Sequence, residues 1–287
     1  MAQRLLTAGF DVTVHTRTRA KARSLIEAGA REASSPAEIG EACEVVITML
    51  PDSSDVAAVM RGKAGVLAGV RSETTWIDMS TISPSVTREL GQAAAERGMA
   101  SLDAPVSGGP PGAAAGTLSI MVGGREEDFD RCLPLLACLG KNIVRMGPLG
   151  AGQVTKACNQ LLVAGTLASV AETLVFAGRA GVDPAAVRKV LLGGYAGSRM
   201  LEVYGQRMIE RDFDPGFFVR LLHKDVDIAL GVAREVAAPT PVAELVAQLL
   251  DSLVAEGHSE ADAAVLVTLY EKLSRLHTAG EMTPKEP

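Results

Sequence analysis

The first half of the chain alternates short β-branched segments with segments that carry helix-start signals. Residues 12–15, 44–50 and 75–79 are apolar and have the length of strands, and the second reads as buried on both faces. The sequence Ser-Pro-Ala-Glu at 35–38 is a capping box with proline at the first helical position, and Ser-Pro at 83–84 starts another helix. Further strand-like segments follow at 101–106, 117–122 and 142–145. This alternation predicts a parallel sheet with helices on both faces.

The pattern changes after Gly147. Residues 152–180 form one apolar, alanine-rich stretch without proline, which is too long for a strand and predicts a long buried helix. Helical segments follow as far as Leu276. We therefore predict an α/β domain of Rossmann type over residues 1–148 and an all-α domain over 149–277, with a loose polar tail at 278–287.

Composition and charge exclude several classes of protein. The chain has 287 residues and a net charge of -6, which disfavours nonspecific binding to nucleic acid or to anionic membranes. No apolar run reaches the roughly 20 residues that a membrane span needs, and the N-terminus lacks the features of a signal peptide. The four cysteines and four histidines are dispersed, so we expect reduced thiols and no metal site. The expected location is the cytoplasm.

Four segments carry a resemblance to a known family. Residues 103–109 read Asp-Ala-Pro-Val-Ser-Gly-Gly, and residues 150–160 read Gly-Ala-Gly-Gln-Val-Thr-Lys-Ala-Cys-Asn-Gln. Residues 49–51 read Met-Leu-Pro, and residues 78–84 read Asp-Met-Ser-Thr-Ile-Ser-Pro. In their order and spacing along the chain, these four segments resemble the β-hydroxyacid dehydrogenases. The resemblance implies a nicotinamide-dependent oxidoreductase that reversibly reduces a small carboxylated aldehyde, with its active site in a cleft between the two domains.

Two later segments point to one branch of that family. Residues 193–201 and 212–225 resemble the tartronate semialdehyde reductases, also called 2-hydroxy-3-oxopropionate reductases. Two alternatives stay open, which are imine reduction on the same fold and a noncatalytic oligomerising or scaffold protein that has lost dinucleotide binding.

The resemblance also implies catalytic and substrate-binding residues. Lys156 would donate a proton to the carbonyl oxygen, with its pKa lowered in an apolar helix; alternatively, its head lies in water. Ser107, with Gly108 and Gly109, would bind the substrate carboxylate through a hydroxyl and backbone N–H groups, unless this is an ordinary turn. The amides of Asn159 and Gln160 share the Lys156 face of the helix, and they would bind substrate or be satisfied core polar groups.

The choice of cofactor follows from residues 15–19, which read His-Thr-Arg-Thr-Arg. An acidic residue after this strand would bind the ribose 2′-OH of NAD, whereas arginine accommodates the phosphate of NADP. We therefore expect NADP(H) to be preferred and NAD(H) to be possible, with Arg17 on the phosphate and Thr18 beside it, unless the basic cluster is only a solvated helix start. The resemblance implies further cofactor contacts from Leu50, Pro51, Thr81 and Lys224.

The beginning of the sequence departs from the family pattern. A dinucleotide-binding fold opens with a strand, a glycine-rich turn and a helix whose N-terminus meets the pyrophosphate. Here residues 1–8 have helical spacing, Gly9 ends that helix, and no GxGxxG precedes the strand that follows. Either the start codon has been assigned too late, leaving out roughly a dozen residues, or the chain is truncated. We expect the first, because losing a central strand would remove ladder bonds and core contacts from both neighbours.

The long helix at 152–180 also bears on assembly. A helix this apolar is expected to be buried against a partner subunit, so we predict a homodimer or homotetramer that acts on a small-molecule substrate. His223 has no partner at a spacing that would indicate an acid–base role, and we expect it to be structural.

Overall fold

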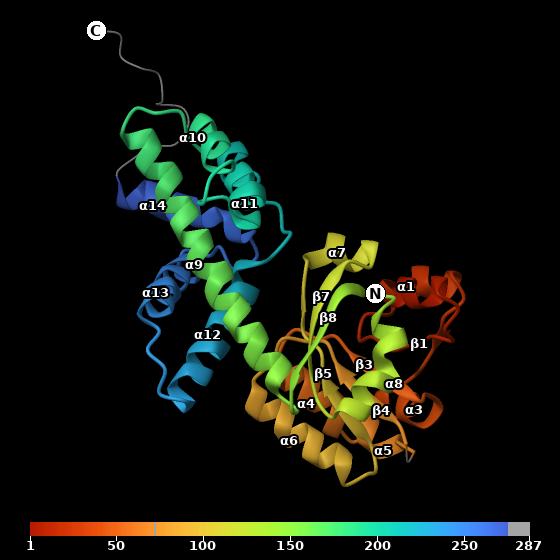
Figure 1. The fold of residues 1–287 in the computed structure, drawn as a ribbon. Helices are drawn as coiled ribbons and strands as arrows, with labels where there is room; N and C mark the ends of the chain where they lie inside the picture. Colours follow the sequence, from red (N-terminus) through yellow and green to blue (C-terminus); the bar gives the residue numbers. More distant parts are fainter. Residues whose placement is uncertain (72, 275–287) are drawn as a thin grey trace. The chain divides into compact units, whose positions relative to one another are not determined.

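The structure is a computed structural model that describes residues 1–71 and 73–274 (Figure 1). The chain divides into two compact units, Met1–Ala157 and Cys158–Pro287. The division falls within one continuous helix, α9 (Ala151–Arg179), which begins in the first unit and continues in the second. The tail expected at 278–287 lies outside the described residues.

The first unit is built around a six-stranded sheet in the order β3-β4-β5-β7-β6, with β8 paired to β7. Its strands are β3 (Val45–Thr48), β4 (Thr75–Asp78), β5 (Ala100–Asp103), β6 (Val106–Ser107), β7 (Leu118–Gly123) and β8 (Gly140–Gly147). The expected parallel pairing holds for β3-β4-β5 and for β7-β8, but β7 runs antiparallel to β5 and β6. Strands β5 and β6 run in the same direction and meet β7 in one register, since Asp103 lies opposite Gly123 and Val106 lies opposite Ile120. The chain reverses between β6 and β7, where residues 108–117 are fewer than the roughly dozen that a parallel crossover requires.

A separate two-stranded sheet lies at the start of the chain. Strand β1 (Thr13–Val14) pairs in parallel with β2 (Arg31–Glu32), and neither pairs with a strand of the larger sheet among the described residues. The expected helix at the N-terminus is confirmed as α1 (Ala2–Thr7), and Gly9 follows it with a φ of 89°, a conformation that glycine adopts without strain.

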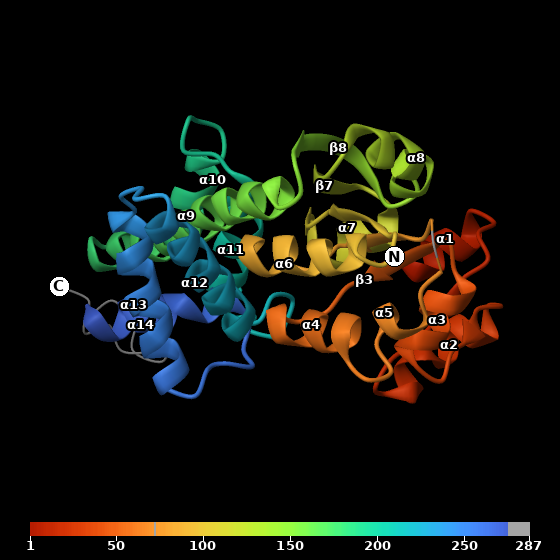
Figure 2. The same ribbon diagram turned by 90° about the horizontal axis from the view of Figure 1, so that it is seen from below.

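Helices cover both faces of the larger sheet (Figure 2). They are α3 (Pro36–Ala42), α4 (Ser53–Arg61), α5 (Val66–Gly69), α6 (Pro84–Ala95), α7 (Gly109–Ala115) and α8 (Glu126–Leu136). Adjacent residues of β4 enter different cores, because side chains alternate between the two faces of a strand. Trp76 packs with residues of α4 and α6, whereas Ile77 packs with residues of β7 and α8.

The expected capping box at residues 35–38 is present with one changed contact. The Ser35 hydroxyl accepts a hydrogen bond from the Glu38 N–H at 3.3 Å. The Glu38 carboxylate accepts from the backbone N–H of Ser34 rather than from that of Ser35. Helix α3 therefore begins where the sequence predicts.

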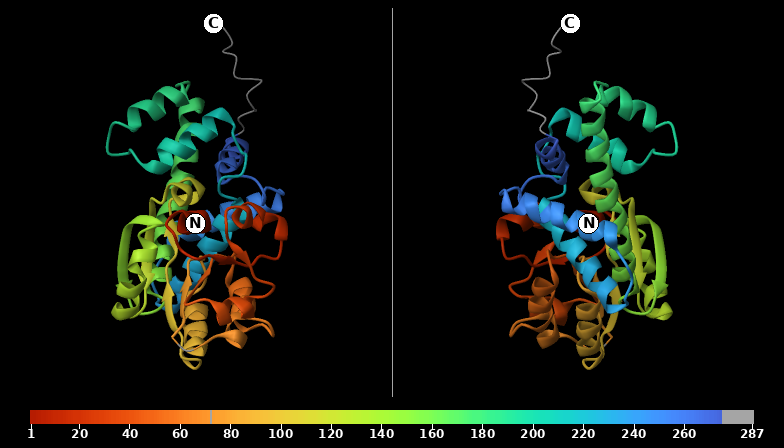
Figure 3. Two further views of the ribbon diagram at one scale, coloured as in Figure 1. Left: turned by 90° about the vertical axis from the view of Figure 1, so that its right-hand side faces the viewer. Right: turned by 90° about the vertical axis from the view of Figure 1, so that its left-hand side faces the viewer.

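The second unit is helical in its described part (Figure 3). After α9 come α10 (Pro184–Leu191), α11 (Arg199–Glu210), α12 (Val219–Glu235), α13 (Pro241–Ala255) and α14 (Leu266–Leu273). The buried face of α9 supplies Leu167 and Leu174 to a core that also contains Leu222 of α12 and Leu250 of α13. This arrangement confirms the all-α class predicted for the second part of the chain.

Helix α9 corrects one expectation from the sequence. By length and composition it could cross a membrane, so the statement that no apolar run is long enough was wrong. The core helix of a soluble protein passes the same test, and α9 places Leu167, Ala171 and Leu174 in the core of its own unit. We therefore interpret α9 as a core helix.

Candidate functional site

Three polar side chains lie in register at the carboxyl ends of the parallel strands β3, β4 and β5. They are Thr48, Asp78 and Asp103. In open α/β sheets, ligands bind beyond this edge of the sheet. The loops that leave β3 and β4 contain Leu50, Pro51 and Thr81, three of the residues that the sequence assigns to the cofactor.

Asp78 is the centre of a buried hydrogen-bond network. Its Oδ1 accepts from the Thr48 hydroxyl at 2.8 Å and from the Ser80 N–H at 3.2 Å. The indole N–H of Trp76 donates to the Thr48 hydroxyl oxygen at 2.9 Å. Burial raises the pKa of Asp78 to about 6 against these hydrogen bonds, and the nearby charge of Asp103 adds to the shift. Its Oδ2 is buried without a hydrogen-bond partner in the described part of the chain.

Asp103 fixes the start of α9. Its Oδ1 accepts from the Gly150 N–H and its Oδ2 accepts from the Gln153 N–H, both at 2.7 Å. Burial raises the pKa of Asp103, and the backbone N–H groups oppose that shift. Gly152 is required here, because a Cβ at this position would come within 2.3 Å of the Met121 carbonyl oxygen. A side chain at the end of β5 therefore satisfies the free N–H groups of the helix that carries Lys156.

The Gln153 side chain joins α9 to the loop after β4. Its Nε2 donates to the Ser80 carbonyl oxygen at 2.9 Å, and its Oε1 accepts from the Ile82 N–H at 3.2 Å. Gln153 is 1% exposed, and the two backbone groups that it contacts flank Thr81. The Ser80 hydroxyl in turn accepts from the Leu50 N–H at 2.9 Å, so the loops after β3 and β4 are tied together.

Lys156 is buried and its head contacts the protein. The residue is 8% exposed, and its Nζ donates to the Val106 carbonyl oxygen at 2.9 Å. The alternative in which the ammonium lies in water is therefore wrong. Val106 immediately precedes Ser107, so the ammonium lies next to the residues expected to bind a carboxylate.

The glycines after Ser107 adopt backbone conformations that other residues rarely adopt. Gly108 has a φ of 129° and Gly109 has a φ of 62°. A Cβ at Gly108 would also come within 3.2 Å of the Leu118 side chain. Both positions therefore favour glycine on steric grounds.

The amides further along α9 belong to a second network, in the helical unit. Asn159 Nδ2 donates to Gln160 Oε1 at 2.7 Å, and Gln160 Nε2 donates to Asp225 Oδ2 at 2.6 Å. Lys224 Nζ pairs with Asp225 Oδ1 at 3.0 Å. Gln160 is 2% exposed, as the alternative of a satisfied core polar group requires. Sequence reasoning missed Asp225, and its position directly after Lys224 was the available signal.

The residues expected at the adenosine end of the cofactor lie after β1. The Arg17 side chain is 82% exposed, and its Nη2 pairs with Asp55 Oδ1 at 3.0 Å. Thr18 is exposed, and its N–H donates to the Thr16 hydroxyl at 3.4 Å. His223 was expected to lack a partner, but it pairs with Asp251 at 2.7 Å and with Asp227, four residues further on, at 3.6 Å.

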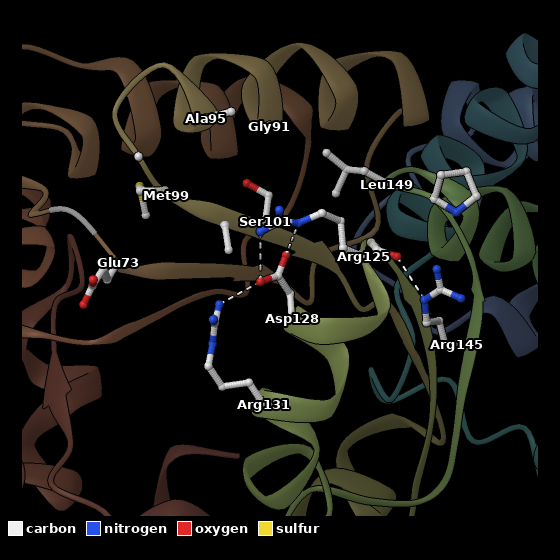
Figure 4. Close-up of a pocket in the computed structure, with 14 residues that line it drawn as sticks. Glu73, Gly91, Ala95, Met99, Ser101, Arg125, Asp128, Arg131, Arg145 and Leu149 are labelled. Carbon is white, nitrogen blue, oxygen red and sulfur yellow. Dashed lines mark hydrogen bonds and ion pairs between the residues drawn. The ribbon is translucent and has the colours of Figure 1, made fainter.

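A pocket of about 870 Å³ lies elsewhere in the first unit, along β5 between α6 and α8 (Figure 4). Its lining includes Arg125, Arg131 and Arg145. Arg125 and Arg131 both pair with Asp128 at 2.8 Å, and Arg145 donates to the Gly124 carbonyl oxygen at 3.1 Å. None of the site residues expected from the sequence lines this pocket.

Comparison with known proteins identifies the family. Residues 1–147 match the NAD binding domain of 6-phosphogluconate dehydrogenase, and residues 150–270 match the NAD-binding model of NADP-dependent 3-hydroxyisobutyrate dehydrogenase. The chain belongs to the 3-hydroxyisobutyrate dehydrogenase-like family of β-hydroxyacid dehydrogenases. It is therefore an oxidoreductase that uses a nicotinamide dinucleotide and acts on small molecules.

Three similar proteins illustrate this membership. The 2-hydroxy-3-oxopropionate reductase of Escherichia coli is 41% identical over 96% of this chain and 94% of its own. A 3-hydroxyisobutyrate dehydrogenase of Pseudomonas aeruginosa is 41% identical over 92% of this chain and 89% of its own. The structure of the Mycobacterium tuberculosis 3-hydroxyisobutyrate dehydrogenase with L-serine has a TM-score of 0.85 and 31% identity, covering 93% of each chain.

Proposed function

We propose that this protein reversibly reduces a small carboxylated aldehyde, of which tartronate semialdehyde is the first candidate, with NADPH as the preferred hydride donor. The observation that carries the proposal is the buried Lys156, whose Nζ is 2.9 Å from the carbonyl oxygen of Val106, the residue that precedes Ser107. The similarity to the E. coli 2-hydroxy-3-oxopropionate reductase supports the choice of substrate, as do the resemblances at residues 193–201 and 212–225.

Lys156 is the proposed proton donor. A bound nicotinamide dinucleotide would supply the hydride that the carbonyl carbon of the substrate accepts. The carbonyl oxygen then needs a proton, and the Lys156 ammonium can provide it while stabilising the negative charge that develops there. The Ser107 hydroxyl and the backbone N–H groups of Gly108 and Gly109 would hold the substrate carboxylate.

Asn159 and Gln160 receive different proposed roles. Asn159 is half-buried and its Nδ2 donates to Gln160, which leaves its amide oxygen to meet a substrate hydroxyl. Gln160 is buried between Asn159 and Asp225, which supports a role in holding the Asn159 amide. Lys224 is proposed to contact the cofactor from its place beside Asp225.

The residues present fit two ends of a nicotinamide dinucleotide. The loops with Leu50, Pro51 and Thr81 leave the carboxyl ends of β3 and β4, the edge of the sheet at which dinucleotides bind. Hydrogen bonds hold these loops in place, which supports a role in positioning the cofactor. Arg17 is an exposed guanidinium at the end of β1, and no carboxylate occurs at 15–19, which favours a 2′-phosphate. The glycine turn that would hold the pyrophosphate is not among residues 1–287.

A homo-oligomer is part of the proposal. On α9, Leu162 and Phe176 are each 73% exposed, although both are large and apolar. Exposed apolar side chains on a long helix are typical of a surface that a partner covers. A second copy of the chain would remove them from water.

The experiment that tests the proposal follows NADPH oxidation with tartronate semialdehyde, alongside 3-oxo acids and a cyclic imine. We expect the hydroxy-substituted aldehyde to give the highest kcat/KM. Preference for the imine would favour the imine reductase alternative. Failure to bind NADPH or to oxidise it with any of them would favour the noncatalytic scaffold.

A further inference from the structure

We infer that Gln153 is a positioning residue, which sets the backbone on both sides of Thr81 for the bound nicotinamide dinucleotide. The inference rests on the proposed function, because it gives the loop after β4 a task in binding the cofactor. The Gln153 amide spans this loop, with Nε2 on the Ser80 carbonyl oxygen at 2.9 Å and Oε1 on the Ile82 N–H at 3.2 Å.

Only an amide of this length satisfies both contacts. The loop presents one acceptor and one donor, and glutamine offers the matching donor and acceptor on a single planar group. An ionised glutamate would keep the contact with Ile82 and lose the donor to Ser80. Leucine would leave both backbone groups buried without a partner, which costs more than the hydrogen bonds themselves contribute.

The other end of Gln153 is equally fixed. Its backbone N–H donates to Asp103 Oδ2 at 2.7 Å, so the residue that holds the loop is itself held by the end of β5. Lys156 lies one helical turn later and contacts the Val106 carbonyl oxygen. The first turns of α9 therefore connect the loop around Thr81 with the segment that leads to Ser107.

This connection matters because hydride and proton must reach adjacent atoms of one carbonyl group. A reaction of this kind is sensitive to displacements of about 1 Å. Packing buries Ile82, which is 0% exposed, and the Gln153 amide adds a directional hydrogen bond on each side of Thr81. Both hydrogen bonds come from the helix that carries the proposed proton donor.

The same contact extends to the neighbouring loop. Ser80 accepts from Gln153 through its carbonyl oxygen, and it accepts from the Leu50 N–H through its hydroxyl. A change at Gln153 should therefore reach both loops that are expected to contact the cofactor.

The test compares Gln153→Leu and Gln153→Glu with wild type and with a control, Thr87→Val. Thr87 is a fully buried residue of α6 in the same unit, and its hydroxyl has no hydrogen-bond partner among the described residues. The control therefore removes a buried hydroxyl that takes no part in the hydrogen bonds of these loops. Hydrogen exchange at the Ile82 amide is measured on protein without cofactor. NADPH affinity, kcat, the aldehyde KM and the melting temperature are measured in parallel.

We expect Gln153→Leu to accelerate exchange at Ile82 by ~10-fold or more, to weaken NADPH binding ~10-fold and to lower kcat ~10-fold. The aldehyde KM should change less than ~2-fold, since the carboxylate loop is untouched. Gln153→Glu should keep Ile82 protected and fall between wild type and Gln153→Leu in kcat. Thr87→Val should match wild type in hydrogen exchange at Ile82, NADPH affinity, kcat and aldehyde KM.

Two results would overturn the inference while leaving the proposed function standing. One is an active wild type whose Gln153→Leu variant binds NADPH and turns over normally. The other is a uniform loss in which the melting temperature and every kinetic parameter decline together and Gln153→Glu rescues nothing, since that pattern describes a structural residue. If Gln153→Leu does not fold, Gln153→Glu is judged by the same criteria. A wild type that neither binds nor oxidises NADPH would overturn both the proposed function and this inference.

Discussion

Asp78 is buried at the end of β4, and one of its carboxylate oxygens, Oδ2, has no hydrogen-bond partner among the described residues. Burial raises its pKa from 3.8 to about 6. Between these values the unfolded chain has lost the proton and the folded chain still holds it. The free energy of unfolding should therefore decrease as the pH rises from about 4 to 6, by ~2–3 kcal/mol from this residue.

Asp78→Asn removes this dependence. The asparagine oxygen can still accept from Thr48 and Ser80, and no charge forms when the pH rises. Urea unfolding at pH 4.5 and 7.5 should show the variant gaining up to ~2–3 kcal/mol relative to wild type at the higher pH. A difference between the two proteins that stays constant across this range would show that Asp78 does not titrate there.

Arg17 tests the choice between the two dinucleotides. Arg17→Asp should weaken NADPH binding ~10- to 100-fold and change NADH binding less than ~3-fold, because only NADPH carries the phosphate that the guanidinium would meet. Arg19→Asp is the matched control and should leave the affinity for both cofactors unchanged. The Arg19 side chain is 80% exposed and pairs with Glu32, as Arg17 pairs with Asp55. Titration of both cofactors by fluorescence checks this, and equal losses for both cofactors in Arg17→Asp would refute the assignment.

At the scale of elements, the start of α9 depends on Asp103. Asp103→Asn replaces one acceptor oxygen with an NH₂ group that faces the N–H of Gly150 or Gln153, so one helix N–H loses its partner. We expect the free energy of unfolding to decrease by ~2–4 kcal/mol. Asp183→Asn makes the same change at the exposed N-cap of α10, where asparagine caps as well as aspartate, and should cost less than ~0.5 kcal/mol. Equal effects in chemical denaturation would contradict the account.

The elements themselves could largely be predicted from the sequence, because their signals are local. Residues 152–180 were expected to form one helix, and α9 covers Ala151–Arg179. The partners of Asp103 and Gln153 could not be predicted, since they lie 47 to 73 residues away in the chain. The antiparallel direction of β7 was missed for the same reason, as strand direction depends on connections that hydrophobic periodicity does not report.

For the candidate site, motifs placed the residues and geometry supplied their contacts. The motif located Lys156, and its buried contact with Val106 needed the fold. Gln160 was expected either to bind substrate or to be a satisfied core polar group, and its hydrogen bond with Asp225, 65 residues away in the chain, needed the fold.

At the scale of the whole molecule, the two large apolar side chains exposed on α9, Leu162 and Phe176, predict assembly. The chain mass is 29.9 kDa. The molar mass of wild type measured by light scattering should therefore be about two or four times that value. Changing Leu162 and Phe176 together to glutamate should yield monomers, because two buried charges would oppose association. Val236→Glu, at a residue 67% exposed outside α9, should leave the assembly intact. A monomeric wild type would contradict this part of the account.

The proposed role of Lys156 as proton donor is tested most directly by measuring NADPH oxidation with tartronate semialdehyde for wild type and for Lys156→Met. Methionine fills similar space and cannot supply a proton. We predict an active wild type and a variant whose kcat falls ~10²- to 10⁴-fold while NADPH affinity stays within ~3-fold of wild type. A wild type that reduces no small aldehyde, or a variant that keeps most of its kcat, would contradict this prediction.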